Sequence, residues 1–320
     1  MSTNPQLLDE LTPDQVAAFK ERALQNQRSS LLRVAGIDSM RNSPLSMWAE
    51  VPEQADLPRL ELSSEGARLG PVIAEGDSWF DYFPGIDVID QLRALGYVFD
   101  KNYAKAGDTL ENMIYGSKYD TLTYARLSPS LTEVLKRLES TKHKIFFFSA
   151  GGNDVAGDGF AQFLNHKDSG LPPFRESHAE IVISQIFKKY LIDLVDKVSS
   201  VSPTTVIMMH GYGYTMPTGK AVINAGPLRF VGPWLRPALT EKGIIDQTEQ
   251  QDIVFRVIDM YNETLQAVAA EKPSFKYVDL RGLIDSKQDW VNELHLRNSA
   301  YYRVARHIHS EVMSLFGMGM

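Results

Sequence analysis

Residues 71–79 read PVIAEGDSW. The apolar run at 72–74 predicts a buried strand, and Pro84-Gly85 predicts the turn that closes the loop after it. Ser78 would then lie just past the carboxyl end of a strand, at the edge of a sheet, with free backbone N–H groups around it. A serine in that place is suited to act as an attacking nucleophile.

From Pro71 onward, strand-like and helix-like segments alternate along the chain. Five nearly continuous apolar runs predict strands, at 71–75, 97–101, 143–149 (HKIFFFS), 204–210 (TTVIMMH) and 274–280 (SFKYVDL). Runs of this kind are typical of parallel strands that are covered on both faces. The pattern predicts an α/β fold, a doubly wound three-layer sandwich around a mainly parallel five-stranded sheet, with its site beyond the carboxyl ends of the strands.

Three helices have clear sequence signals. Ser177-x-x-Glu180 predicts the start of one that ends before Pro203, and Thr248-x-x-Gln251 predicts the start of another. A third is expected to begin near Asn298. The buried stripes of the last two helices are predicted to consist of Val254, Ile258, Tyr261, Leu265 and Val268, and of Tyr301, Ala305, Ile308, Val312 and Leu315.

The chain is expected to divide at residue 70. Thr12-Pro13-Asp14-Gln15 predicts a helix that continues through Ala23, and residues 42–70 look irregular, so 1–70 is interpreted as a helical and irregular N-terminal extension. Residues 71–320 would form the catalytic domain. Two inserts near 155–176 and 211–247 are too long to be simple connections. The aromatic side chains of the second favour a packed lid or pocket wall, or a structural flap; they are Tyr212, Tyr214, Phe230 and Trp234.

Four short blocks occur in order: Gly76-Asp77-Ser78, Ala106-Gly107-Asp108-Thr109, Gly151-Gly152-Asn153-Asp154 and Asn292-Glu293-Leu294-His295. Their order and spacing resemble those of the SGNH (GDSL-type) hydrolases, a family of serine esterases. The resemblance covers the chain from about Pro71 to the C-terminus. It implies a serine esterase that hydrolyses carboxylic esters, acyl or acetyl and possibly lipid-like, without a metal or other cofactor.

The resemblance also implies site residues. Ser78 would be the nucleophile and His295 the general base. The oxyanion hole would consist of the backbone N–H groups of Ser78 and Gly107 and the side-chain amide of Asn153. Of the seven histidines, only His210 and His295 fall at the predicted catalytic edge, and a histidine at the end of a strand, like His210, is more often structural.

The third catalytic position departs from the family. The family places aspartate three residues before the histidine, where this chain has Asn292. An amide oxygen can orient the imidazole but brings no full negative charge, and the acid-to-amide change costs a serine protease about four orders of magnitude in turnover. Asn292 or a nearby backbone carbonyl is expected to orient His295, with Asp289 as the reserve acid. Asp77 and Asp154 are expected to fix their own turns.

The aromatic run at 79–83 (WFDYF) could line an apolar pocket, although at least half of it is expected to pack in the core. Net charge −7 makes nucleic acid an unsuitable partner, and no window approaches the roughly 20 apolar residues of a membrane span. Zero cysteines exclude disulfides and cysteine metal sites. The N-terminus lacks a secretory signal, so cytoplasmic residence is expected, and export without such a signal stays open as an alternative. Two alternatives stay open: a metal-dependent phosphoesterase, and an SGNH-fold binding protein with impaired catalysis.

Overall fold

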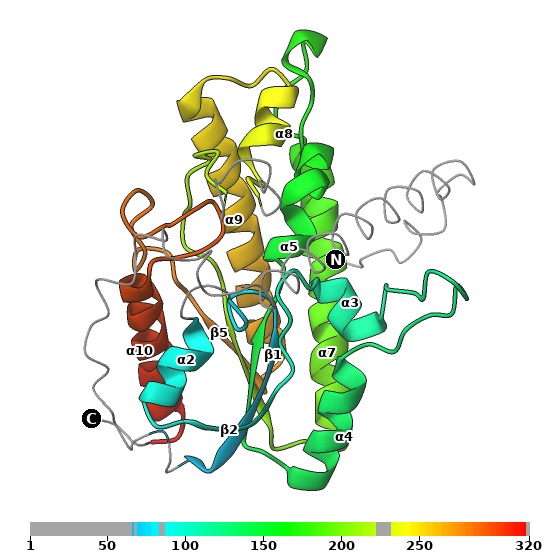
Figure 1. The fold of residues 1–320 in the computed structure, drawn as a ribbon, viewed down its shortest axis with the longest axis vertical. Coiled ribbons are helices and arrows are strands. Elements are labelled where there is room, and N and C mark those ends of the chain that lie inside the picture. Colours follow the sequence, from blue (N-terminus) through cyan, green and yellow to red (C-terminus); the bar gives the residue numbers. More distant parts are fainter. Residues whose placement is uncertain (1–65, 67–68, 83–86, 222–231, 318–320) are drawn as a thin grey trace, which may run out of the picture.

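The protein is represented by a computed structural model that describes residues 66, 69–82, 87–221 and 232–317 (Figure 1). Its centre is a sheet of five parallel strands in the order β2-β1-β3-β4-β5. The strands are β1 (Pro71–Gly76), β2 (Val98–Asn102), β3 (Ile145–Ser149), β4 (Val206–His210) and β5 (Phe275–Val278). The predicted strands and fold class are therefore confirmed, with strand ends within two residues of those expected.

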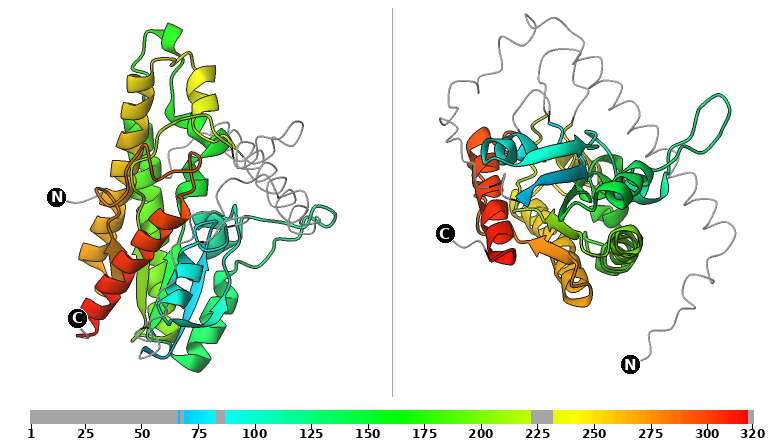
Figure 2. Two further views of the ribbon diagram at one scale, coloured as in Figure 1. Left: turned by 60° about the vertical axis from the view of Figure 1, so that its left-hand side comes forward. Right: turned by 90° about the horizontal axis from the view of Figure 1, so that it is seen from below.

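Helices cover both faces of the sheet (Figure 2). Along β1, Val72 and Ala74 face the cluster formed with α2 (Val88–Ala94) and α10 (Asn298–Leu315), whereas Ile73 faces the other side. The helices on that second side are α4 (Leu131–Thr141), α7 (Lys188–Val201) and α9 (Gln247–Glu271). Because successive side chains of a strand point to opposite faces, one apolar run supplies both layers of core.

The strand order places β1 between β2 and β3. Chain connections after β1 and after β3 therefore lead to opposite sides of the sheet, which opens a crevice at the carboxyl ends of these two strands. Gly76, at the end of β1, pairs with Ser149, at the end of β3. Ser78 and Asn153 follow these strand ends, so the topology brings them to one edge.

Two predicted helix starts were wrong in detail. The helix predicted from Ser177 runs through α6 (Glu176–Ala179), a π-helical turn (Glu180–Phe187) and α7. It begins at Glu176, since the Arg175 carbonyl accepts the first helical N–H, that of Ala179, at 3.0 Å; the Arg175 N–H itself donates to the Phe163 carbonyl (2.8 Å).

The second wrong start is that of α9. This helix begins at Gln247, and the carboxylate of Asp246, not Thr248, accepts the N–H of Glu249 at 2.9 Å. A carboxylate also interacts favourably with the positive end of a helix. The predicted stripe of α9 is buried throughout, whereas Leu315 at the end of α10 is 36% exposed and does not belong to its stripe.

The remaining elements are α3 (Leu110–Tyr115), α5 (Gly152–Val155), the 3₁₀ helices Gly157–Phe163 and Lys167–Ser169, and α8 (Arg236–Glu241). The first predicted insert thus carries helical turns of its own. None of the described helices has both the length and the apolar character that crossing a bilayer would need. The expected helix from Thr12, most of the irregular arm at 42–70, the Pro84-Gly85 turn and Phe230 lie outside the described residues.

Candidate active site

Ser78 lies two residues beyond the end of β1, in a turn that is bonded to the neighbouring strand. The Asp77 N–H donates to the Ser149 carbonyl (3.1 Å), and the Asp77 carboxylate accepts the Trp79 N–H (3.0 Å) and the Ser149 hydroxyl (2.8 Å). A Cβ on Gly76 would lie 3.0 Å from the Cβ and the carbonyl oxygen of Ser149, so the close approach of β1 and β3 favours glycine there. Asp77 thus fixes its own turn, as expected, and also ties it to β3.

His295 reaches Ser78 from the loop before α10. Its Nε2 lies 2.8 Å from the Ser78 hydroxyl oxygen, and its Nδ1 lies 3.0 Å from Oδ1 of Asn292. The indole N–H of Trp79, next to the serine, donates to the Leu294 carbonyl at 2.9 Å. The serine turn and the histidine loop are therefore joined directly.

The amide of Asn292 is held in one orientation. Its Oδ1 accepts the backbone N–H groups of Leu294 and His295, both at 3.0 Å, in addition to its contact with the imidazole. Two donors that face this atom require it to be the oxygen, so Nδ1 of the ring carries the proton and Nε2 presents a lone pair to Ser78. The other amide atom, Nδ2, is buried and has no hydrogen-bond partner in the described part of the chain.

The two acidic residues near Asn292 in the sequence, Asp289 and Glu293, interact with groups other than the His295 ring. The Asp289 carboxylate accepts the N–H of Asp285 at 2.7 Å and forms an ion pair with Arg303 at 2.5 Å. Glu293 is completely buried, and its carboxylate accepts four backbone N–H groups at 2.6–3.2 Å, those of Gly219, Trp234, Leu235 and Arg236. Glu293 therefore fastens the 211–247 insert to the histidine loop.

Aromatic rings enclose His295. The ring of Tyr82 stacks on the imidazole, with 4.3 Å between centroids and 17° between planes, and Trp234 contacts it at 5.5 Å and 67°. Burial lowers the pKa of His295 to about 3, because the imidazolium would lose its hydration. The histidine is therefore neutral at physiological pH, which is the form a base needs.

His210 lies behind the serine turn. Its Nδ1 lies 2.7 Å from the Gly211 carbonyl oxygen, and its ring stacks on Trp79 at 4.8 Å. Tyr212 donates its hydroxyl to the Asp77 carboxylate at 3.0 Å and accepts the N–H of Gly152 at 3.2 Å. The structural interpretation of His210 fits these contacts, and Tyr212 links the turns after β1 and β3.

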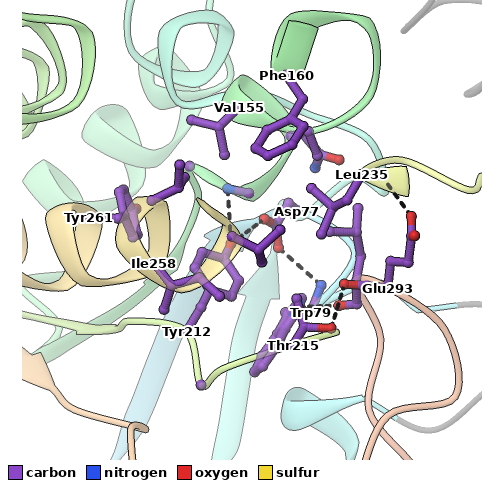
Figure 3. Close-up of a pocket in the computed structure, with 18 of the residues that line it drawn as sticks. Asp77, Trp79, Val155, Phe160, Tyr212, Thr215, Leu235, Ile258, Tyr261 and Glu293 are labelled. Atoms are coloured by element: carbon purple, nitrogen blue, oxygen red, sulfur yellow. Dashed lines mark hydrogen bonds between the residues drawn. The ribbon is translucent and has the colours of Figure 1, made fainter. Parts of the chain in front are cut away.

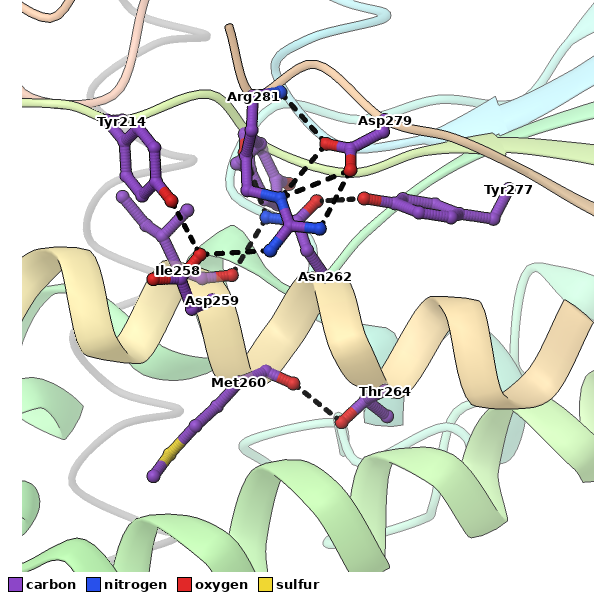
Figure 4. A network of polar contacts seen from close by, with 10 residues as sticks. Tyr214, Ile258, Asp259, Met260, Asn262, Thr264, Tyr277, Asp279 and Arg281 are labelled. Carbon is purple, nitrogen blue, oxygen red and sulfur yellow. Dashed lines mark hydrogen bonds and ion pairs between the residues drawn. The ribbon is translucent and has the colours of Figure 1, made fainter.

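A polar network holds the beginning of the 211–247 insert against α9 (Figure 4). The side-chain amide of Asn262 donates to the Tyr212 carbonyl at 2.9 Å, and Tyr214 donates its hydroxyl to Asp259 at 2.7 Å. Arg281 bridges Asp259 (2.9 Å) and Asp279 (2.7 Å). The first residues of the insert are thus held in place by hydrogen bonds to α9.

The expected oxyanion donors lie in segments that are bonded to each other. Nδ2 of Asn153 donates one hydrogen to the Asp108 carbonyl at 2.9 Å, which leaves its second hydrogen for another acceptor. Asp154 accepts the N–H groups of Leu110 (2.8 Å) and Glu111 (3.4 Å) at the start of α3, so it fixes a neighbouring segment rather than its own turn. Gly107 has φ +78°, a conformation that favours glycine.

A cavity of about 670 Å³, including its open mouth, lies beside Ser78 (Figure 3). Both Ser78 and Asn153 line this cavity. Apolar side chains supply most of the wall and come from the serine turn, α5, the 3₁₀ helix after it, the residue before α8, α9 and the histidine loop. They include Trp79, Val155, Phe160, Leu235, Val254, Val257, Ile258 and Leu294. The cavity can therefore receive an apolar group attached to a carbonyl at Ser78.

Several contacts of this site have no signal in the amino-acid sequence. The partners Tyr82–His295, Tyr212–Asp77 and Glu293–Trp234 lie far apart along the chain, and no motif joins them. In the sequence, Tyr82 is one residue of the aromatic run at 79–83. Among the residues that the structure describes, no three His, Asp or Glu side chains form a group that could hold a metal ion.

No protein-family model matches the chain, and no curated protein matches it by sequence. Among solved structures, an extracellular lipase from Streptomyces rimosus is similar at 14% identity and TM-score 0.46, over 74% of this chain and 98% of the lipase. A family 3 carbohydrate esterase from Clostridium thermocellum is similar at 14% identity and TM-score 0.43, over 78% of this chain and 98% of the esterase. Phospholipase A1 from Streptomyces albidoflavus NA297 is similar at 15% identity and TM-score 0.43, over 74% of this chain and 98% of the phospholipase. Likeness at this level does not decide what this chain does. A proposal about its function must be argued from the geometry of its own site.

Proposed function

We propose that this protein is a serine hydrolase of carboxylic esters. The observation that carries the proposal is the 2.8 Å contact between Nε2 of His295 and the hydroxyl of Ser78, at the edge of an apolar cavity. A free serine hydroxyl is a poor nucleophile at neutral pH, and a neutral imidazole within hydrogen-bond reach is the group that activates it.

In the proposed reaction, His295 takes the proton of Ser78 as the serine oxygen attacks the ester carbonyl carbon. The resulting tetrahedral intermediate carries negative charge on the former carbonyl oxygen. The donors proposed for that oxygen are the N–H groups of Ser78 and Gly107 and the second amide hydrogen of Asn153, each worth about 3–4 kcal/mol. His295 then protonates the departing alcohol, which leaves the acyl group as an ester on Ser78. Water attacks this ester with His295 as the base, the carboxylic acid departs, and the Ser78 oxygen regains its proton from His295.

Asn292 serves in this mechanism as the residue that orients His295. The acid-to-amide change in a serine protease costs about four orders of magnitude because it selects the wrong imidazole tautomer. Here the N–H groups of Leu294 and His295 hold the amide oxygen toward the ring, which supports the correct tautomer. The amide therefore forgoes only the stabilisation that a full negative charge would give to the imidazolium.

The cavity supports an ester with an apolar acyl group, a small molecule or a lipid, rather than a charged one. The net charge of −7 supports a substrate other than nucleic acid. Cytoplasmic residence stays part of this proposal. The metal-dependent phosphoesterase and the binding protein with impaired catalysis are the alternatives that the experiment must separate.

The test uses p-nitrophenyl esters of graded acyl length and a fluorophosphonate, which labels an activated serine covalently. Wild type is expected to hydrolyse the esters and to gain the mass of one adduct at Ser78. Ser78→Ala is expected to lose both while remaining folded. Hydrolysis of bis(p-nitrophenyl) phosphate that a chelator abolishes would favour the phosphoesterase. A folded wild type with neither turnover nor label would favour the binding protein.

A further inference from the structure

The two hydrogen bonds of the His295 imidazole provide no negative charge to stabilise its protonated form. Both ring nitrogens face neutral oxygens, the amide of Asn292 and the hydroxyl of Ser78. Yet a base that takes a proton becomes an imidazolium, and in this buried place the cation loses its hydration. Some other group must stabilise the positive charge if the site is to turn over well.

In the described part of the chain, the carboxylates of the serine turn, of the segment after it and of the histidine loop accept other donors. Asp77 accepts Trp79 N–H, Asp81 accepts Ala106 N–H, Asp87 accepts the N–H groups of Tyr82 and Asp90, and Glu293 accepts those of the insert. Arg297, two residues beyond the histidine, donates to the Gln288 carbonyl. Burial alone accounts for the low pKa of His295.

The face of Tyr82 covers the imidazole. At 4.3 Å between centroids and 17° between planes, the two rings are stacked closely enough for an imidazolium to lie over the negative face of the phenol ring. Asp87 fixes the backbone of this residue, since its carboxylate accepts the Tyr82 N–H at 3.1 Å. The backbone position of Tyr82, and with it the stack, is therefore fixed by a hydrogen bond.

We propose that the ring of Tyr82 stabilises the imidazolium of His295 by a cation–π interaction, and so supplies part of what a carboxylate at position 292 would have supplied. The proposal rests on the proposed function, because the imidazolium forms as Ser78 loses its proton. Tyr82 acts through His295 and needs no contact with the substrate.

Three variants test this role. Tyr82→Leu keeps an apolar cover but removes the π face, and is expected to lower kcat about tenfold. Tyr82→Phe retains the face and is expected to rescue most of that loss. Tyr124→Leu, the same exchange at a tyrosine that is 78% exposed, is the matched control. Stepwise fluorination of a phenylalanine at position 82 withdraws electron density from the ring at nearly constant shape, so kcat is expected to fall with each fluorine.

The background of Asn292→Asp separates charge from packing. With a carboxylate beside His295, Tyr82→Leu is expected to cost only about twofold, because the charge is then supplied. An equal loss in both backgrounds, or a loss that fluorination does not reproduce, would overturn the proposal and leave Tyr82 as packing.

An NMR titration of His295 gives a readout that needs no turnover. Tyr82→Leu is expected to lower the pKa of the ring by about one unit relative to Tyr82→Phe. A pKa that stays the same or rises would refute the interaction. If the pKa falls but no variant hydrolyses an ester, the cation–π contact stands and the proposed function fails.

Discussion

Oδ1 of Asn292 and Nδ1 of His295 lie 3.0 Å apart, so the ring that reaches Ser78 is oriented by a neutral amide. The backbone N–H groups of residues 294 and 295 turn the amide oxygen, and not its nitrogen, toward the imidazole. Orientation and charge, which a single aspartate supplies together in a familiar triad, are thus separable in this protein.

Asn292→Asp is expected to raise turnover modestly, by up to about tenfold, because the tautomer is already correct and only charge is added. The carboxylate should also raise the pKa of His295 from about 3. A base works only when it is neutral, so kcat/KM should fall at low pH around a higher midpoint in the variant than in wild type. Profiles of kcat/KM against pH measure this shift, and a large loss of turnover would contradict it.

Asn292→Ala and Asp289→Asn should differ sharply. The first removes the oxygen that orients His295 and should lower kcat about 100-fold. The second breaks the ion pair with Arg303, so it should reduce thermal stability and leave kcat within about twofold. The comparison uses kcat and melting temperature of both variants. A larger loss of kcat in Asp289→Asn than in Asn292→Ala would make Asp289 the acting acid.

Val257→Phe should shift the preference toward shorter acyl chains. Val257 lies on α9 and lines the cavity beside Ser78, so a larger side chain occupies space that the acyl group would use. Overpacking costs about 1–3 kcal/mol, which thermal unfolding would detect. Gln266→Phe, at an exposed position of the same helix, is the control. Equal changes of kcat/KM for all chain lengths would argue against an acyl-binding role.

Glu293→Gln should loosen the 211–247 insert. The carboxylate accepts four N–H groups, and an amide offers them only one oxygen, so buried donors lose their partner at a cost of about 1–3 kcal/mol. We expect a lower melting temperature, faster proteolysis within the insert and altered acyl-length preference. Glu263→Gln, an exposed exchange on α9, should change none of these. If only the melting temperature falls, the insert is a structural flap.

The sequence predicted the fold well because the strands are short, nearly uniform apolar runs. IFFFS of β3 and VIMMH of β4 admit few other interpretations between polar flanks. Helix starts were less certain, since Asp246 and Thr248 both satisfy a capping pattern and only the folded backbone selects one. The order of the four sequence blocks was enough to select Ser78, Asn292 and His295 as candidate site residues. The stack of Tyr82 on His295 could not be predicted, because stacking depends on three-dimensional placement that no local pattern encodes.

The contact between Ser78 and His295 joins residues that are 217 positions apart in the sequence. Closing so long a loop is entropically costly, and contacts of this range form slowly during folding. The proposed active site therefore exists only after β1 and the segment before α10 have docked on the same sheet. Recovery of catalysis during refolding should consequently trail the recovery of helical circular dichroism, which makes activity a sensitive reporter of the final step of assembly.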